Sequence, residues 1–232
     1  MPLVVDPQFD RLPQKSPRRC WGVFTKRERW GLIWQGWLAL LLASVLLVGF
    51  FLVTVHPFLA ATYRVDANIL VVEGWVHDYV IQAAAREFAT GGPNTGSGGY
   101  TWDADTSASV GAGQLRTAGV PAASLQMVPS HVIGRDRTYY SAVALREWFR
   151  ERNMNVGSFN IIAESTHSRR TWLLFQEAFG DKVKVGVIAV QNPDYDPKCW
   201  WRSSDGFRDV VSEAIAYFYA KLFVHPRKVP NR

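Results

Sequence analysis

The feature that most constrains this chain is an uncharged apolar run near its amino end. Residues 30–55 (26 residues) contain no Asp, Glu, Lys or Arg and read WGLIWQGWLALLLASVLLVGFFLVTV. A helix of that length extends about 39 Å, which exceeds the roughly 30 Å hydrocarbon core of a bilayer. Trp30, Trp34 and Trp37 cluster at its amino end, and aromatic rings favour the membrane–water boundary. The run therefore predicts a single-pass transmembrane helix in contact with the lipid bilayer.

The charges on either side of this run predict its orientation. Residues 1–63 carry seven Lys or Arg before the run against three Asp or Glu, whereas Arg64 alone follows soon after it. The positive-inside rule then places the amino terminus in the cytoplasm and residues 66–223 outside the cytoplasmic (inner) membrane of a bacterial-type cell. We expect residues 1–29 to be a disordered basic tail, 56–65 a linker and 224–232 a second basic tail. The alternative is a signal peptide cleaved after Ala60-Ala61, but its apolar region is normally only about 7–15 residues long.

The remaining charge argues against nucleic acid as a partner. The net charge is +6, but beyond residue 63 the chain has 19 basic and 17 acidic groups. A duplex-binding domain needs its positive charge on the folded part. The two cysteines, Cys20 and Cys199, would lie on opposite sides of the membrane, so we expect no disulfide.

The outer segment alternates short apolar runs with amphipathic segments. The runs 68–72, 125–128, 160–163 and 183–190 are typical of buried strands, and a further strand should end at 97–99. Helices are expected over 78–89, 107–118, 137–152, 171–179 and 205–223. Repeated strand–helix units predict an α/β, Rossmann-like three-layer domain over residues 66–223, with a mainly parallel sheet of about five strands.

Polar residues follow the predicted strands, at the edge where open α/β sheets place their ligands. The candidate residues are Glu73 and Gly74 after the first strand, Ser97, Gly98 and Gly99 after the second, Arg137 and Thr138 after the third, and Glu164, His167 and Arg170 after the fourth.

These residue types suggest an anion site with proton-transfer chemistry. His167 titrates near neutral pH, and Glu73 or Glu164 can orient it or activate water. Arg137 and Arg170 can grip a phosphate or carboxylate, and a Gly-rich turn before a helix can cradle one. Each feature also has a structural explanation, as a helix cap, a surface ion pair or a flexible turn.

Other chemistries have weaker signals. His77, His131 and His167 lack metal-ligand spacing, so no metal site is predicted. Hydroxyl nucleophiles such as Ser97 or Ser165 have no assigned base. Glu213 lies in an apolar helix, where a buried carboxylate needs a partner. Trp200 and Trp201 either line a groove or pack at an interface. The sequence identifies no cofactor and no oligomeric state.

Several short motifs occur in the order seen in a known family. Gly74, Ser97-Gly98-Gly99, Gly119-Val120-Pro121, Arg137-Thr138 and His167-x-x-Arg170 resemble the SanA/ElyC/YdcF family, and the single N-terminal anchor resembles its membrane-anchored branch. The resemblance covers residues 66–223 and implies a Rossmann-like domain with a polar cleft and a part in envelope or peptidoglycan-precursor maintenance. It supplies no established reaction. Many members have a glutamate where this chain has Ser107, and asparagines near the Thr138 turn are replaced by Arg137 and Ser141.

Two functions follow as expectations. The first is a hydrolase or transferase acting on an anionic envelope component, such as a lipid-linked sugar pyrophosphate. The second is a non-catalytic binding or regulatory module for envelope assembly. A cofactor-binding methyltransferase-like domain is a third reading, which the extracytoplasmic location disfavours.

Overall fold

The computed structural model describes residues 19–20, 24–26, 30–90, 94–98, 107–128, 130 and 136–224. The chain divides into two units, residues 1–51 and 52–232. Gly99, His131 and the other residues outside these ranges, including most of the two terminal tails, are not described.

In its described residues, the first unit has three short antiparallel strands and most of a long helix. The strands are β1 (Arg19–Cys20), β2 (Phe24–Lys26) and β3 (Trp30–Leu32), paired in that order. The expectation of a tail without regular structure is therefore corrected for residues 19–20 and 24–26. Strands of two or three residues are too short to produce the alternating pattern by which a sequence indicates a strand.

Helix α1 (Trp34–Leu59) contains the apolar run. It is the one helix among the described residues that is long and apolar enough to span a membrane. Its side chains are largely exposed: Leu46 and Phe50 are 65% and 68% exposed. It begins and ends four residues later than the predicted span 30–55, so the expected linker loses its first residues to the helix. The helix continues past Val55 because Leu59 is buried in the second unit, a contact that the apolar run alone does not show.

The second unit is built on a parallel sheet. Its strands are β4 (Ile69–Glu73), β5 (Asn94–Gly98), β6 (Gln126–Val128), β7 (Ser158–Glu164) and β8 (Lys184–Val190), in the order β6-β5-β4-β7-β8. Every neighbouring pair runs parallel. The predicted α/β class with a parallel sheet is confirmed.

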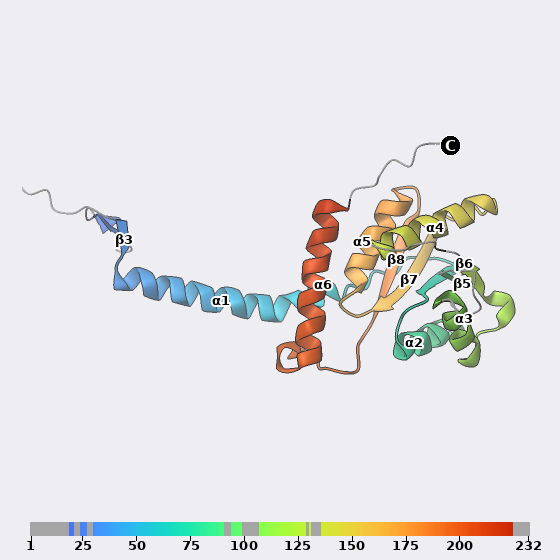
Figure 1. Cartoon of the computed structure of the whole chain (residues 1–232), viewed down its shortest axis with the longest axis horizontal. Coiled ribbons are helices and arrows are strands. Elements are labelled where there is room, and N and C mark those ends of the chain that lie inside the picture. Colours follow the sequence, from blue (N-terminus) through green and yellow to red (C-terminus); the bar gives the residue numbers. More distant parts are fainter. Residues whose placement is uncertain are drawn as a thin grey trace, which may run out of the picture. The chain divides into compact units, whose positions relative to one another are not determined.

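Helices cover both faces of this sheet (Figure 1). Helices α4 (Arg137–Glu151) and α5 (Ser168–Phe179) pack on one face, against Val71, Phe159 and Ile161. Helices α2 (Asp78–Ala89) and α3 (Ser107–Thr117) pack on the other, against Leu70, Val72 and Ile162. Consecutive residues along β4, and likewise along β7, face opposite helix layers and are buried on both faces. The sequences of these strands are therefore continuous apolar runs.

The strand order reverses next to β4, which places a crevice at the carboxyl ends of β4 and β7. From β4 the chain first adds β5 and β6 on one side and then β7 and β8 on the other. Such a reversal leaves room for a ligand between the first loops of the two halves. Glu73 ends β4 and Glu164 ends β7, so two predicted residues lie at this point.

The last two turns of α1 belong to the core of the second unit. Val55 and Leu59 pack with Tyr195, Trp200 of η2 (Trp200–Arg202), and Val210 and Tyr217 of α6 (Ser204–Phe223). The Trp200 Nε1–H donates to the carbonyl of Leu52 (2.9 Å), and the Ser168 hydroxyl donates to the carbonyls of Leu59 (3.1 Å) and Ala61 (3.0 Å). Residues 52–61 are therefore an integral part of the folded unit. The remaining short helix, η1, spans Ala122–Ser124.

Gly74 allows α3 to begin directly against the end of β4. A Cβ at Gly74 would lie 2.6 Å from the carbonyl oxygen of Ser107, the first residue of α3. Gly111, one turn further along α3, would bring a Cβ to 3.3 Å from the Gly74 Cα. Both glycines serve close packing of a helix on a strand end.

We predict that Gly74→Ala lowers the free energy of unfolding by about 1–3 kcal/mol, the usual cost of overpacking. The control is Gly113→Ala on the same helix, where an added Cβ meets nothing within 4 Å; there the better helix propensity of Ala should add up to about 1 kcal/mol. Urea unfolding of the full chain in detergent, followed by circular dichroism, measures both. Equal midpoints for Gly74→Ala and the wild type would contradict this packing.

Candidate functional site

The turn between β7 and α5 is polar and almost completely buried. Ser165, Thr166 and Ser168 are 3%, 1% and 0% exposed. The Ser165 N–H donates to the carbonyl of Val190 (2.8 Å), and Ser168 binds the end of α1 as described above. This turn is therefore anchored at both ends, and burial keeps the Ser165 hydroxyl from acting as a surface nucleophile.

His167 projects from this turn between two carboxylates. Its Nε2 lies 3.4 Å from Glu73 Oε2, and its Nδ1 lies 3.2 Å from Glu213 Oε1. The His167 and Glu73 side chains are only 14% and 2% exposed. Three elements far apart in the sequence, β4, α5 and α6, thus meet at one imidazole.

Arg170 completes the cluster from the next turn of α5. Its Nε and Nη2 donate to the two oxygens of Glu213, each at 2.9 Å, in the bidentate geometry that arginine–carboxylate pairs favour. Burial lowers the pKa of Arg170, but the hydrogen bonds and charge of Glu213 outweigh it and the net shift is upward. The sequence predicted Arg170 as an anion clamp, whereas here two of its N–H groups are engaged by Glu213.

Charge balance determines the protonation of His167. Arg170 Nη2 also lies 2.9 Å from Nδ1, a position from which it can donate only to a neutral ring. A neutral ring, however, leaves two carboxylates facing one guanidinium in a site shielded from water. Burial lowers the pKa of His167, but the close contacts with Glu213 and Glu73, and the negative charges of these two carboxylates, outweigh it and raise the pKa to about 9. We therefore assign an imidazolium at neutral pH.

Glu213 is a site residue that the sequence did not place in the site. Burial raises its pKa, but hydrogen bonds to His167 and Arg170 and their positive charges outweigh this and hold it at about 2. The signal was its position in an apolar helix, which required a buried partner. Sequence alone does not say which partner, since His167 and Arg170 are more than 40 residues away.

Glu73 has unused hydrogen-bonding capacity. Neither of its carboxylate oxygens has a hydrogen-bond partner among the described residues, because the 3.4 Å approach of His167 lacks hydrogen-bond geometry. A buried carboxylate without donors is costly. This oxygen pair is therefore available to a donor at the carboxyl edge of the sheet.

A pocket of about 210 Å³ opens beside the cluster. It is lined by four of the predicted residues, Arg137, Thr138, His167 and Arg170, together with Trp75, Asp136, Leu174, Ala216, Tyr219, Ala220 and Val224. Within the described part of the chain, no side chain caps the start of α4 here: Asp136 adopts a left-handed conformation (φ 60°) and makes no capping hydrogen bond. An uncapped helix start and a nearby guanidinium both favour an anion.

Glu164 does not join this cluster. It binds His77, accepting from the backbone N–H at 3.1 Å and contacting the ring Nδ1. The hydrogen bond and charge of Glu164 raise the pKa of His77. The predicted role of Glu164 in orienting His167 is therefore corrected: Glu73 and Glu213 flank the ring instead.

The structure describes only part of the Gly-rich stretch Ser97-Gly98-Gly99 that was predicted to bind an anion. Ser97 and Gly98 are the last residues of β5, and Gly98 pairs with Glu73, so its backbone lies beside the site. Gly99 lies outside the described residues. Gly74, predicted to contact an anion, packs against Ser107.

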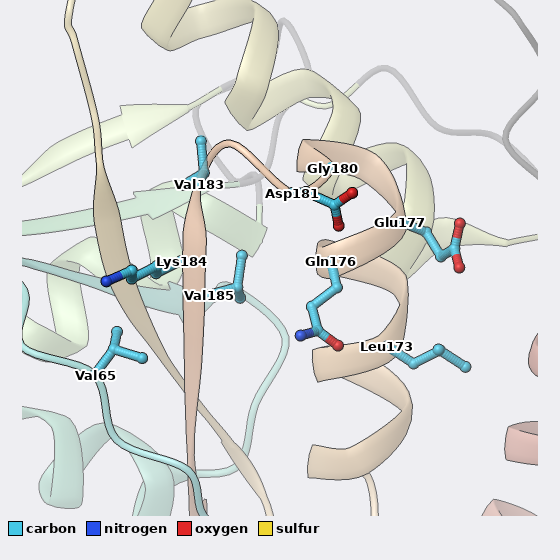
Figure 2. Close-up of a pocket in the computed structure, with 9 residues that line it drawn as sticks. All are labelled: Val65, Leu173, Gln176, Glu177, Gly180, Asp181, Val183, Lys184 and Val185. Atoms are coloured by element: carbon cyan, nitrogen blue, oxygen red, sulfur yellow. The ribbon is translucent and has the colours of Figure 1, made fainter.

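A larger pocket of about 750 Å³ lies at the other edge of the sheet, between the end of α5 and the start of β8. Figure 2 shows that the side chains of Lys184 and Glu177 point away from each other there. None of its lining residues belongs to the predicted set: they are Val65, Leu173, Gln176, Glu177, Gly180, Asp181, Val183, Lys184 and Val185. The charges of Lys184 and Glu177 therefore do not converge on one point of this surface.

Comparison of the chain with protein-family models, with curated proteins and with solved structures gives no match.

The raised pKa of His167 predicts a loss of stability at alkaline pH. A histidine whose pKa is higher in the folded state contributes stability below its unfolded value of 6.5, and the contribution is lost as pH rises through about 9. We expect wild type to lose on the order of 3 kcal/mol more than His167→Gln between pH 6.5 and pH 10. Urea unfolding across this range measures the difference. Parallel pH profiles for the two proteins would show that the ring is not charged in the fold.

Removing Glu213 should leave two cations without their partner. Glu213→Ala is expected to cost about 3–5 kcal/mol, as for other buried pairs broken on one side. Glu177→Ala, at an exposed position of α5, should change stability by less than about 0.5 kcal/mol. Thermal and urea unfolding of both variants provide the test, and a neutral Glu213→Ala would mean that the cluster does not hold α6 in place.

Proposed function

We propose that the protein is a single-pass membrane protein whose Rossmann-like domain binds and acts on a phosphate-bearing, lipid-linked precursor of the cell envelope. In this proposal α1 spans the cytoplasmic membrane, the amino terminus is cytoplasmic and the α/β unit lies outside. The length and apolar surface of α1 support the anchor. The strand order, which is that of a doubly wound sheet up to its fifth strand, supports the Rossmann-like assignment.

The packing of residues 52–61 supports an anchor that is retained. Leu59 and Ala61 are 1% and 5% exposed, and the buried Ser168 donates to the carbonyls of both. Cleavage after Ala60-Ala61 would remove Val55 and Leu59 from the core of the folded unit. A signal peptide, by contrast, leaves the mature fold intact.

The observation that carries the proposed activity is the pocket beside the buried imidazolium. Arg137 and the start of α4 supply positive potential for a phosphate, which the Asp136 carboxylate in the same lining partly offsets. His167 lines the same pocket and carries a proton at neutral pH, so it serves as a proton donor to a phosphate oxygen. Arg170 acts through Glu213 to position the ring.

The second candidate function is a non-catalytic binding module for envelope assembly. One observation favours it: the charges of Glu73, His167, Glu213 and Arg170 compensate one another, as in structural ion clusters. The same pocket then holds the ligand, and no proton is transferred.

The ordered motifs that resemble the SanA/ElyC/YdcF family support the envelope context of either proposal. Of these, Arg137, Thr138, His167 and Arg170 line the pocket, and Gly74 and Gly98 lie at the adjoining strand ends. The family assignment remains a proposal that rests on these motifs.

The anion site is tested with Arg137→Ala. We expect the full chain in detergent to bind a polyprenyl diphosphate, and the variant to bind it at least about tenfold more weakly, equivalent to about 1.4 kcal/mol. Arg116→Ala, at an exposed position of α3 outside the pocket, is the control and should bind as wild type does. Equal affinities for wild type and Arg137→Ala would contradict a phosphate site here.

His167→Gln separates the two candidate functions. If the protein is an enzyme, this variant should retain binding of the polyprenyl diphosphate but lose release of phosphate or transfer of the prenyl-linked group. If it is a binding module, cells that carry His167→Gln should have a normal envelope, and the variant should bind the polyprenyl diphosphate with wild-type affinity. Turnover by His167→Gln at the wild-type rate would exclude His167 as the proton donor.

A further inference from the structure

Helix α6 carries a second apolar stripe that the fold leaves exposed. Phe207, Ile215, Phe218 and Leu222 are 53%, 67%, 54% and 61% exposed, and Val211 lies between the first two. Their spacing of four, four, three and four residues keeps them on one side of the helix. The buried side of α6, with Val210, Ala214 and Tyr217, packs on the end of α1. The helix is therefore apolar on two sides. On the outer side, Val211 packs partly against the core and the Phe207 ring lies 6.2 Å from that of Trp200. Ile215, Phe218 and Leu222 remain more than half exposed in the described structure.

The position of α6 along the proposed anchor indicates what covers this stripe. Counted from Trp34, the roughly 20 residues needed to cross a hydrocarbon core end near Val53. The next residues of α1 are those that contact α6: the rings of Phe58 and Tyr217 lie 5.3 Å apart, and Val55 and Leu59 join the same core. Packed helices lie about 8–10 Å apart. In the proposed anchor, the part of α6 around Val210 and Tyr217 thus lies beside the residues of α1 that reach the headgroups.

A second copy of the chain is a poorer match for the stripe. Stable protein interfaces bury roughly 800 Å² per partner and involve about 20–30 residues a side. The stripe offers five side chains along one helix. An amphipathic helix lying in the membrane interface needs only such a stripe, with aromatic residues on the apolar side.

Charge supports the same occupant. The stripe contains no ionisable side chain, and the eight residues after Val224 include Arg227, Lys228 and Arg232 but no Asp or Glu. Basic residues next to an apolar helix face favour anionic phospholipids.

We propose that the outer stripe of α6 lies in the interface of the bilayer that α1 spans, so that the α/β unit rests on the membrane surface. This inference rests on the proposed anchor. It also deepens the proposed function, because Ala216, Tyr219 and Ala220 of the same helix line the pocket. A pocket built on a helix at headgroup depth suits a lipid-linked ligand.

Spin labels on the full chain test the inference. In a Cys20→Ser, Cys199→Ser background, single labels are placed at Ile215→Cys and Phe218→Cys on the stripe and at Leu42→Cys within α1. The exposed Arg116→Cys on α3 is the aqueous control. The proteins are reconstituted in vesicles of phosphatidylethanolamine and phosphatidylglycerol. Power saturation then compares access of oxygen, which enters lipid, with access of a water-soluble nickel chelate.

We expect labels at 215 and 218 to show a several-fold higher oxygen-to-nickel ratio than the label at 116. An aqueous ratio at 215 and 218, with a lipid ratio at 42, would overturn the inference and leave the anchor intact. An aqueous ratio at 42 would overturn the anchor itself. Dipolar broadening at 215 and 218 without lipid access would show that a second copy covers the stripe, which also overturns it.

Discussion

The carboxylate of Glu213 is the interaction on which this edge of the sheet depends. It comes from α6 and binds Arg170 of α5 through both oxygens and His167, in the turn before α5, through one. Burying a carboxylate or an imidazolium alone costs desolvation free energy, and the attraction between the two opposite charges offsets that cost. Through His167 the network continues to Glu73 at the end of β4. One side chain thereby joins α6, α5 and the centre of the sheet.

The turn that carries His167 also holds the apolar helix. Ser168 binds the carbonyls of Leu59 and Ala61, and Arg169 binds the carbonyl of Phe58 while its guanidinium lies 4.1 Å from the centre of the Phe58 ring. These contacts satisfy carbonyls at the end of α1 that have no partner within the helix. The end of the proposed anchor and the proposed proton donor are consequently fixed by consecutive residues, so a change at this turn affects both.

Much of the fold could be predicted because local patterns decide it. The stripe of α2 and the apolar runs of β4 and β7 identify their elements to within a residue or two, and parallel strands gather the residues after them at one edge. The sequence did not predict which histidine each strand-end glutamate contacts. Glu164 and Glu73 are both strand-end glutamates, yet the first binds His77 and the second faces His167, since the outcome depends on side-chain direction and helix placement. The extra turn of α1 likewise depends on tertiary contacts of Leu59.

The protonation state of His167 decides whether the ring is a proton donor or a base. Nuclear magnetic resonance of the full chain with isotope-labelled histidine measures it directly, with the signal assigned by its absence in His167→Gln. We expect an imidazolium spectrum through neutral pH and a pKa of about 9 for His167. A ring that titrates near the ordinary value of 6.5, or a neutral ring accepting a hydrogen bond from Arg170 at Nδ1, would contradict it.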